Sequence, residues 1–252
     1  MKLLFRSQRH RPCRRVAGLL RVAAYARASW RMMFLLLNLV HPLVSRAACG
    51  EAISATTQEL IAEEQALHTT EQTVRSSRTR LQMLEAQLQD LLAQPPANYD
   101  QTLARKLAAL RRMEVEPKRR TLENLRVQHE DSRKQWERGR RLLNPQLVEA
   151  QTAFQAKTMT HEEFCRVRET YQQALRLYLQ GMQSYRQGMD LYARALNECA
   201  DRFFTPYING FTEPRQWEEL IAQLQRGDFL HDILIPMTAN AVRSVPPDAP
   251  PE

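Results

Sequence analysis

The sequence is short of glycine, with seven in 252 residues, which is less than half of the average usage of about 7%. This shortage argues against glycine-rich phosphate loops, tight hairpins and β-sandwiches, which need glycine at positive φ. The motifs of P-loop nucleotide binding, of serine hydrolases and of His-Glu-x-x-His metalloproteases do not occur either. We therefore expect an all-α protein that is not an enzyme and that has neither a metal site nor a cofactor.

Acidic residues are missing from the first 50 positions, which hold ten of the 36 basic residues. A short apolar block, Met32 to Val40, follows the basic stretch, and Ala47 and Ala48 offer small residues at a cleavage position. These are the parts of a secretory signal peptide. The block is too short for a membrane-spanning helix, which needs about 20 apolar residues. The sequence thus predicts a cleaved leader over residues 1–48 and a periplasmic or secreted protein.

Two other targeting signals are compatible with the same region. An arginine-rich start without acids also resembles a mitochondrial presequence. Ala47-Ala48-Cys49-Gly50 ends like the lipid-attachment box of a lipoprotein, but Arg46 stands where such boxes carry leucine. We therefore favour an ordinary cysteine at position 49 over a lipid anchor.

Removal of the leader changes the net charge of the chain from +8 to −2, because all 28 acidic residues remain against 26 basic ones. The high isoelectric point of about 9.6 is thus a property of the leader. A body close to neutrality is not the electrostatic footprint of a nucleic-acid binder, so we do not expect nucleic acid as a partner.

The chain after the predicted leader, residues 49–252, is predicted to consist mainly of long helices. Residues 54–94 contain neither glycine nor proline, and apolar residues recur at seven-residue intervals, which is a coiled-coil pattern: Leu60, Leu67, Val74, Leu81 and Leu88. The second seam position of the first half is polar, with Glu63, Thr70 and Ser77. We expect this seam to pack against polar side chains of another helix. A homodimer formed along the seam could provide that helix.

Further helices are expected over 100–143, with a kink near Pro117, and over 145–157, after a break at Asn144-Pro145. The clearest helix covers 161–204 and begins with the capping box of Thr160 and Glu163. Its seam then alternates in steps of four and three, and the tyrosines in it are interpreted as core. The seam runs through Phe164, Arg168, Tyr171, Leu175, Tyr178, Met182, Tyr185, Met189, Tyr192, Leu196, Cys199 and Phe203.

Three long helices of similar length joined by short turns favour an elongated antiparallel three-helix bundle over residues 49–204. Residues 205–243 are expected to form a small helical cap at one end of this bundle, and residues 244–252 a disordered proline-rich tail. The last short amphipathic turn of the cap is expected to end before Pro236. The cap is rich in aromatic residues. Phe211, Trp217 and Phe229 are either its core or an exposed surface for a partner.

Three cysteines remain after the leader: Cys49, Cys165 and Cys199. Cys165 and Cys199 lie 34 residues apart, or about 51 Å on one helix, so they cannot form a disulfide with each other. Cys49 could pair with either of them. On the seam, Cys199 is best interpreted as a small buried apolar residue.

Basic residues are concentrated in the second helix, most densely at Arg111, Arg112, Lys118, Arg119 and Arg120. Such a face can bind lipid headgroups or an acidic protein. We favour another interpretation, in which these bases pair with the acidic residues of the first helix, because charge pairs between helices set the orientation of a bundle.

Together these features predict an exported, non-catalytic coiled-coil protein that acts by protein–protein contact, such as a secretion or conjugation accessory or a surface component. Two alternatives use the same features differently. One is an inhibitor or immunity protein that blocks its partner with the aromatic cap. The other is a BAR-like rod that binds anionic membranes through its basic second helix.

Overall fold

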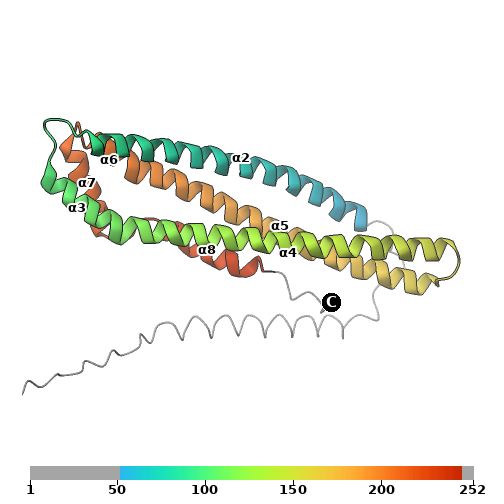
Figure 1. The fold of residues 1–252 in the computed structure, drawn as a ribbon. Coiled ribbons are helices and arrows are strands. Elements are labelled where there is room, and N and C mark those ends of the chain that lie inside the picture. The colour runs from blue at the N-terminus through green and yellow to red at the C-terminus, as the bar shows by residue number, and fades with distance from the viewer. Residues whose placement is uncertain (1–51, 246–252) are drawn as a thin grey trace, which may run out of the picture. The chain divides into compact units, whose positions relative to one another are not determined.

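The computed structural model describes residues 52–245, with side chains from residue 55 onward, and every regular element in this range is helical. All of these residues belong to one compact unit, Ala48–Glu252. The predicted leader, Cys49 and the tail beyond residue 245 lie outside the described residues. The expected all-α class is confirmed for the part of the chain that is described (Figure 1).

Helix α2, Ala52–Ala93, contains the predicted heptads, and Leu60, Leu67, Leu81 and Leu88 of the seam are at most 4% exposed. The polar half of the seam has polar partners, as expected: Thr70 donates a hydrogen bond to Asp190, and Glu63 pairs with Arg186. These partners lie on α5 of the same chain. The seam is therefore used within the molecule and is not a free surface for a second copy.

Helix α3, Gln101–Leu110, is capped by Asp100, whose side chain accepts from the amides of Thr102 and Leu103. A π-helical turn, Arg111–Val115, joins it to α4, Glu116–Gln155. This turn lies where the sequence predicts a kink, directly before Pro117. The wider π turn suits that position because proline has no amide to donate and its ring crowds the preceding turn.

The predicted helix break at Asn144-Pro145 is wrong, because α4 continues through Pro145 to Gln155. Proline removes one backbone hydrogen bond, whose acceptor would be the carbonyl of Arg141. Arg141 and Pro145 are both exposed, so water can bind this carbonyl. The cost of the missing bond is then small enough for the helix to continue.

Helix α5, His161–Cys199, starts with the predicted capping box of Thr160 and Glu163. A second π-helical turn, Ala200–Phe204, leads into the short α6, Thr205–Asn209. As at Pro117, a proline is the second residue after the turn, here Pro206. The seam tyrosines Tyr178, Tyr185 and Tyr192 are 3–5% exposed. Their interpretation as core residues is confirmed.

Helix α5 is packed on both sides by the other long helices (Figure 1). Helix α2 runs parallel to it, since Glu63 meets Arg186 and Arg80 meets Asp201. Helix α4 runs antiparallel to it, since Asn144 meets Tyr171 and Glu123 meets Tyr192. Helices α2 and α4 are joined mainly by long charged side chains.

The C-terminal helices are α7, Pro214–Gln225, and α8, His231–Arg243. Helix α7 packs on α3 and α6, as a cap would, but α8 folds back along α5 and α4. It also continues through Pro236, before which the sequence predicts its end. The prediction of a cap confined to one end of the bundle is thus wrong for α8, because its apolar face, including Ile233 and Met237, is buried along the flank of the long helices.

None of the described helices is both long enough and apolar enough to cross a membrane.

Candidate functional site

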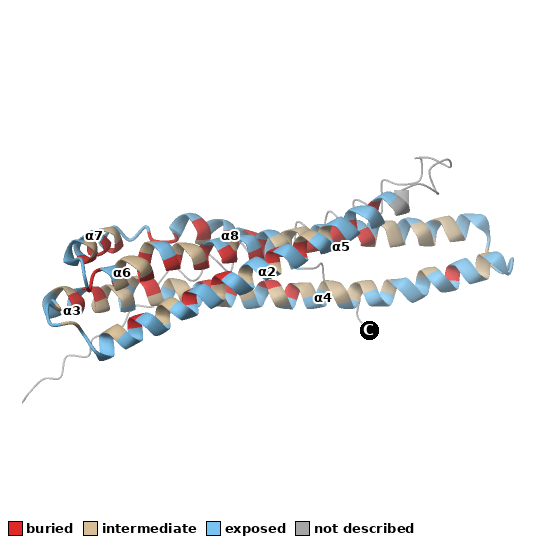
Figure 2. Ribbon diagram, turned by 90° about the horizontal axis from the view of Figure 1, so that it is seen from above, coloured by how far each residue is buried: buried red, intermediate tan, exposed pale blue. Residues whose placement is uncertain are grey.

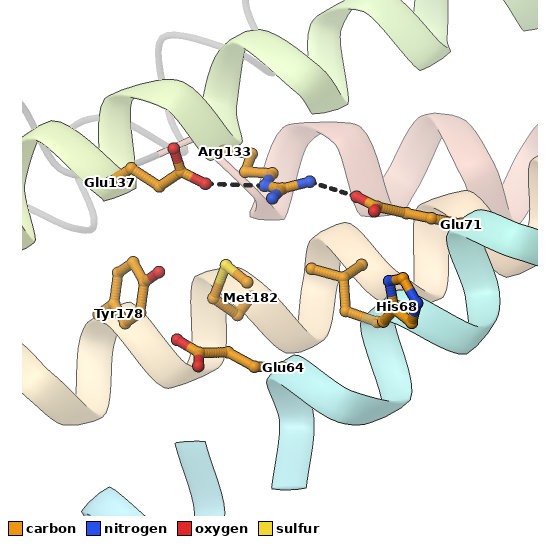
Figure 3. A pocket seen from close by; sticks show the side chains of 8 residues that line it. Glu64, His68, Glu71, Arg133, Glu137, Tyr178 and Met182 are labelled. Atoms are coloured by element: carbon orange, nitrogen blue, oxygen red, sulfur yellow. Dashed lines mark hydrogen bonds and ion pairs between the residues drawn. The ribbon is translucent and has the colours of Figure 1, made fainter. Parts of the chain in front are cut away.

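A cavity of about 270 Å³ lies where α2, α4 and α5 meet (Figure 3). Its floor is apolar and comes from α5 and α2, while its rim is charged and comes from α2 and α4. The lining residues are Glu64, Leu67, His68, Glu71, Arg133, Glu137, Tyr178 and Met182. The rim brings carboxylates and a histidine together, and these are the side chains that metal sites and acid–base catalysis use.

Arg133 holds the charged rim together. Its Nε lies 2.9 Å from Glu137, and its guanidinium also pairs with Glu71 across the cavity (Figure 3). Burial alone would lower the pKa of Arg133, but hydrogen bonds with Tyr185 and Glu137 and the charge of Glu71 raise it above its ordinary value. The rim therefore carries compensated charges.

This arrangement repeats along the bundle every seven residues. Arg140 lies 5.2 Å from the ring centre of Tyr178 and pairs with Glu64, just as Arg133 lies 5.2 Å from Tyr185 and pairs with Glu71. Each arginine thus combines a cation–π contact with an ion pair to α2. The cavity thus lies between two such links.

Two of the three candidate metal ligands of the rim take part in these links. Glu64, His68 and Glu71 share one face of α2, as metal ligands would, but the two carboxylates are committed to Arg140 and Arg133. His68 lies 2.9 Å from the side-chain nitrogen of Gln72. Among the residues whose placement is described, no group of three or more His, Cys, Asp or Glu could hold a metal ion.

Phe211, Trp217 and Phe229 do not form a partner surface, because they are 2%, 1% and 0% exposed. The indole of Trp217 donates to the carbonyl of Tyr207 at 2.6 Å and packs edge-on against Phe211 at 5.0 Å. The prediction of an exposed aromatic patch is wrong for these residues. They are the core that fixes α7 to the end of the long helices.

The basic face predicted in the second helix is largely engaged within the molecule. Arg119 pairs with Glu85 of α2, as the interpretation by interhelix pairing expects. Arg111 and Lys118 pair locally with Glu116 and Glu114, at 2.9 and 3.3 Å. The remaining two residues of the face, Arg112 and Arg120, are exposed. The face thus presents little concentrated positive charge for a membrane or an acidic protein.

The cysteines occupy different environments. Cys199 is 1% exposed, and burial raises the pKa of its thiol to about 12. Such a thiol is a packing residue and not a nucleophile. The Cys165 sulfur lies 3.6 Å from Nε2 of His161 in the first turn of α5. Because α5 is uninterrupted between the two cysteines, they cannot meet.

A surface that the sequence did not single out lies on the α4–α5 hairpin. This hairpin extends beyond the start of α2 (Figures 1 and 2), and we call residues 141–175 the projecting hairpin. Glu64–Arg140 is an α2–α4 ion pair at its base. Leu142 and Val148 in it are 64% and 62% exposed. The sequence contained one indication of this surface. Leu142 and Val148 lie on either side of Pro145 and do not belong to a regular heptad pattern.

The projecting hairpin is ordered by contacts between its own two helices. Phe154 and Phe164 stack with ring centres 4.7 Å apart, and Tyr171 donates to the side chain of Asn144 at 3.0 Å. Both phenylalanines remain partly exposed. Leu175 at the base is still buried with Leu60 and Leu67 of α2. Toward the tip of the hairpin the described residues provide no third helix (Figure 1), so apolar side chains stay accessible there.

The fold and these surfaces define a helical bundle. No protein-family model, no curated protein and no solved structure matches the chain.

Proposed function

We propose that the protein is exported, loses its leader after Ala48, and acts in the cell envelope or outside the cell as a non-catalytic binding protein. In this proposal α2, α4 and α5 work as a rigid three-helix bundle. The projecting hairpin supplies the contact surface for a protein partner. The observation that carries the proposal is the exposure of Leu142 and Val148 on a hairpin that no described helix covers.

Two further observations support a binding role. The charged cavity has its arginines and carboxylates engaged with each other, and the one buried thiol, Cys199, has a pKa raised to about 12. Apolar side chains that are exposed in one region mark protein interaction sites, and the projecting hairpin adds the partly exposed Leu147, Phe154 and Phe164 to Leu142 and Val148. Removal of residues 1–48 also leaves too little chain before Ala52 to extend α2 along the hairpin, since three residues of helix add about 5 Å.

The export step predicts the N-terminus of the mature chain. Full-length protein produced in its own cells should begin at Cys49, because Ala47 and Ala48 place small residues at the end of the leader. Mass spectrometry of the purified protein reads this terminus directly. A chain that retains the arginines of residues 1–31 would contradict export through a cleaved leader.

The contact surface is tested by a photo-reactive amino acid at Val148, with Val127 of the same helix as the matched control. Both side chains are exposed, by 62% and 41%, but Val127 lies within the part of α4 that is packed in the bundle. We expect illumination of living cells to give one discrete adduct from position 148 and none from position 127. Equal adducts at both positions, or none at 148, would contradict a partner site on the projecting hairpin.

A further inference from the structure

The last turn of α8 is fastened to α4 and α5 by polar contacts. Trp136 of α4 donates from its indole nitrogen to the carbonyl of Ser244 at 2.8 Å. Asn240 donates from its side chain to the carbonyl of Ser184 on α5. The Ser244 hydroxyl lies 2.9 Å from the carbonyl of Ala241 and donates to it. Ser244 is thus the point where α8 meets α4.

The second α4 residue at this point is His129, which is 0% exposed. Its Nδ1 lies 3.3 Å from the hydroxyl oxygen of Ser244. With that hydroxyl donating to Ala241, the contact is satisfied when Nδ1 carries the ring proton and donates to Ser244. In this tautomer the lone pair lies on Nε2, and this buried atom has no hydrogen-bond partner among the described residues.

Two glycines of α5 make room for the α4 rings that contact Ser244. A Cβ atom at Gly188 would lie 2.5 Å from Cε1 and Nε2 of His129, and one at Gly181 would overlap the indole of Trp136. The glycines are seven residues apart, and so are the two rings. The His129 ring is thus packed directly against the backbone of α5, and its Nε2 is buried away from solvent.

The charged and titratable groups on the three elements around His129 are engaged elsewhere. On α8 no charged side chain lies between Asp232 and Arg243. On α4 and α5 the neighbouring groups pair with each other or with α2, in these combinations: Arg126 with Glu123 and Glu130, Arg133 with Glu71 and Glu137, Tyr185 with Arg133, and Tyr192 with Arg78 and Glu123. No carboxylate is thus available to stabilise an imidazolium at this position.

We propose that α8 is a proton-operated strap, in which protonation of His129 at Nε2 releases the last turn of α8 from α4 and α5. A charged ring is disfavoured in this buried site, where no carboxylate offsets its charge, and the ring gains contact with water when its contact with α8 opens. Opening frees Ser244 and uncovers Trp136 and the glycine face of α5. This inference does not depend on the contact surface of the projecting hairpin.

The direction of the pH dependence follows from the burial of the ring. Burial lowers the pKa of His129 below its ordinary value of 6.5, and the carbonyl of Met237 offsets this only in part. The open state binds a proton more readily than the closed state, so acid favours opening. The strap is fully closed above pH 6.5 and loosens as the pH falls below it.

Hydrogen exchange of the full chain at pH 7.5 and 5, corrected for intrinsic exchange rates, tests the strap. We expect the opening equilibrium of amides 237–244 to rise about tenfold for each pH unit below 6.5 until the pKa of the closed state is reached. Amides of α7 should not change. NMR titration of the His129 ring should give the same midpoint as the loss of α8 protection. A ring that titrates without any change in α8, or α8 amides whose protection is independent of pH, would overturn the proposal.

Two variants separate the strap from general acid sensitivity. His129→Gln removes the titrating group and should abolish the pH response of α8. His231→Gln is the matched control, since His231 begins the same helix but is exposed, and it should keep the full response. If His129→Gln does not fold, the midpoint comparison in the unmodified chain decides alone. A pH response that survives in His129→Gln, or disappears in His231→Gln, assigns the effect to another group.

Discussion

Trp217→Ala is expected to lower the free energy of unfolding by about 3–5 kcal/mol, the range for truncation of a large buried aromatic residue. The indole is 1% exposed and contacts Tyr99, Tyr207 and Phe211. Its removal leaves a cavity and an unpaired carbonyl at Tyr207. Urea unfolding followed by circular dichroism at 222 nm measures the loss.

The same variant distinguishes the two interpretations of the aromatic residues. At a temperature where it is folded, Trp217→Ala should still give the adduct from position 148, because the projecting hairpin lies at the far end of the long helices from α7 (Figure 1). Trp217→Phe should cost less, since it keeps a ring but loses the 2.6 Å hydrogen bond to Tyr207. If Trp217→Ala abolished the adduct while the free energy of unfolding stayed unchanged, Trp217 would be part of the surface that contacts the partner.

Gly188→Ala is expected to destabilise the protein by about 2 kcal/mol, although alanine is the better helix former. A Cβ at this position would lie 2.5 Å from the His129 ring. That ring is enclosed between α5 and α8, so overpacking of about 1–3 kcal/mol and loss of the Ser244 contact exceed the gain in helix propensity. Thermal unfolding measures the effect.

Gly139→Ala provides the matched control, because a Cβ there meets nothing within 4 Å. It should stabilise the protein by up to about 1 kcal/mol through helix propensity alone. The two alanine substitutions therefore shift the melting temperature in opposite directions. If both substitutions shifted the melting temperature in the same direction, a Cβ at Gly188 would not clash with the His129 ring as the structure indicates.

The parts of the fold set by local signals could be predicted. The capping box at Thr160 and the four-and-three spacing of the seam identify α5 from its first residue to Cys199 and continue into the π-helical turn at Phe203. The seven-residue repeat from Leu60 to Leu88 does the same for α2. In both cases one short-range pattern fixes the helix and its buried face, so no knowledge of distant residues is needed.

Two predicted helix limits failed at prolines. Pro145 and Pro236 both lie inside helices, because one missing hydrogen bond is a local cost that the rest of a long helix can outweigh. Sequence alone does not say whether water can reach the freed carbonyl. The position of α8 was missed for a different reason, since it depends on contacts between residues more than 100 positions apart, such as Trp136 and Ser244.

The candidate surfaces also differed in whether local sequence patterns or contacts between distant residues determined them. Interhelix charge pairing could be predicted from opposite charges on two helices, whereas the burial of Phe211 and Phe229 depended on how α7 and α8 fold back. The seven-residue spacing shared by His129 and Trp136 and by Gly181 and Gly188 was the one sequence signal for the Ser244 contact. It becomes readable only when the two helices are known to be antiparallel neighbours.

The two π-helical turns, Arg111–Val115 and Ala200–Phe204, have a consequence for how the chain tolerates changes in length. Each turn holds one residue more than an α-helix needs over the same stretch. Deletion of one residue within either turn would therefore restore ordinary helical geometry there and leave the residues that follow on the same face of the helix. After the second turn Tyr207 would thus stay in the core. A deletion inside the adjoining α-helices would instead turn every later residue by about 100° around the helix axis. Single-residue deletions should therefore be tolerated better at these two turns than in the α-helices beside them.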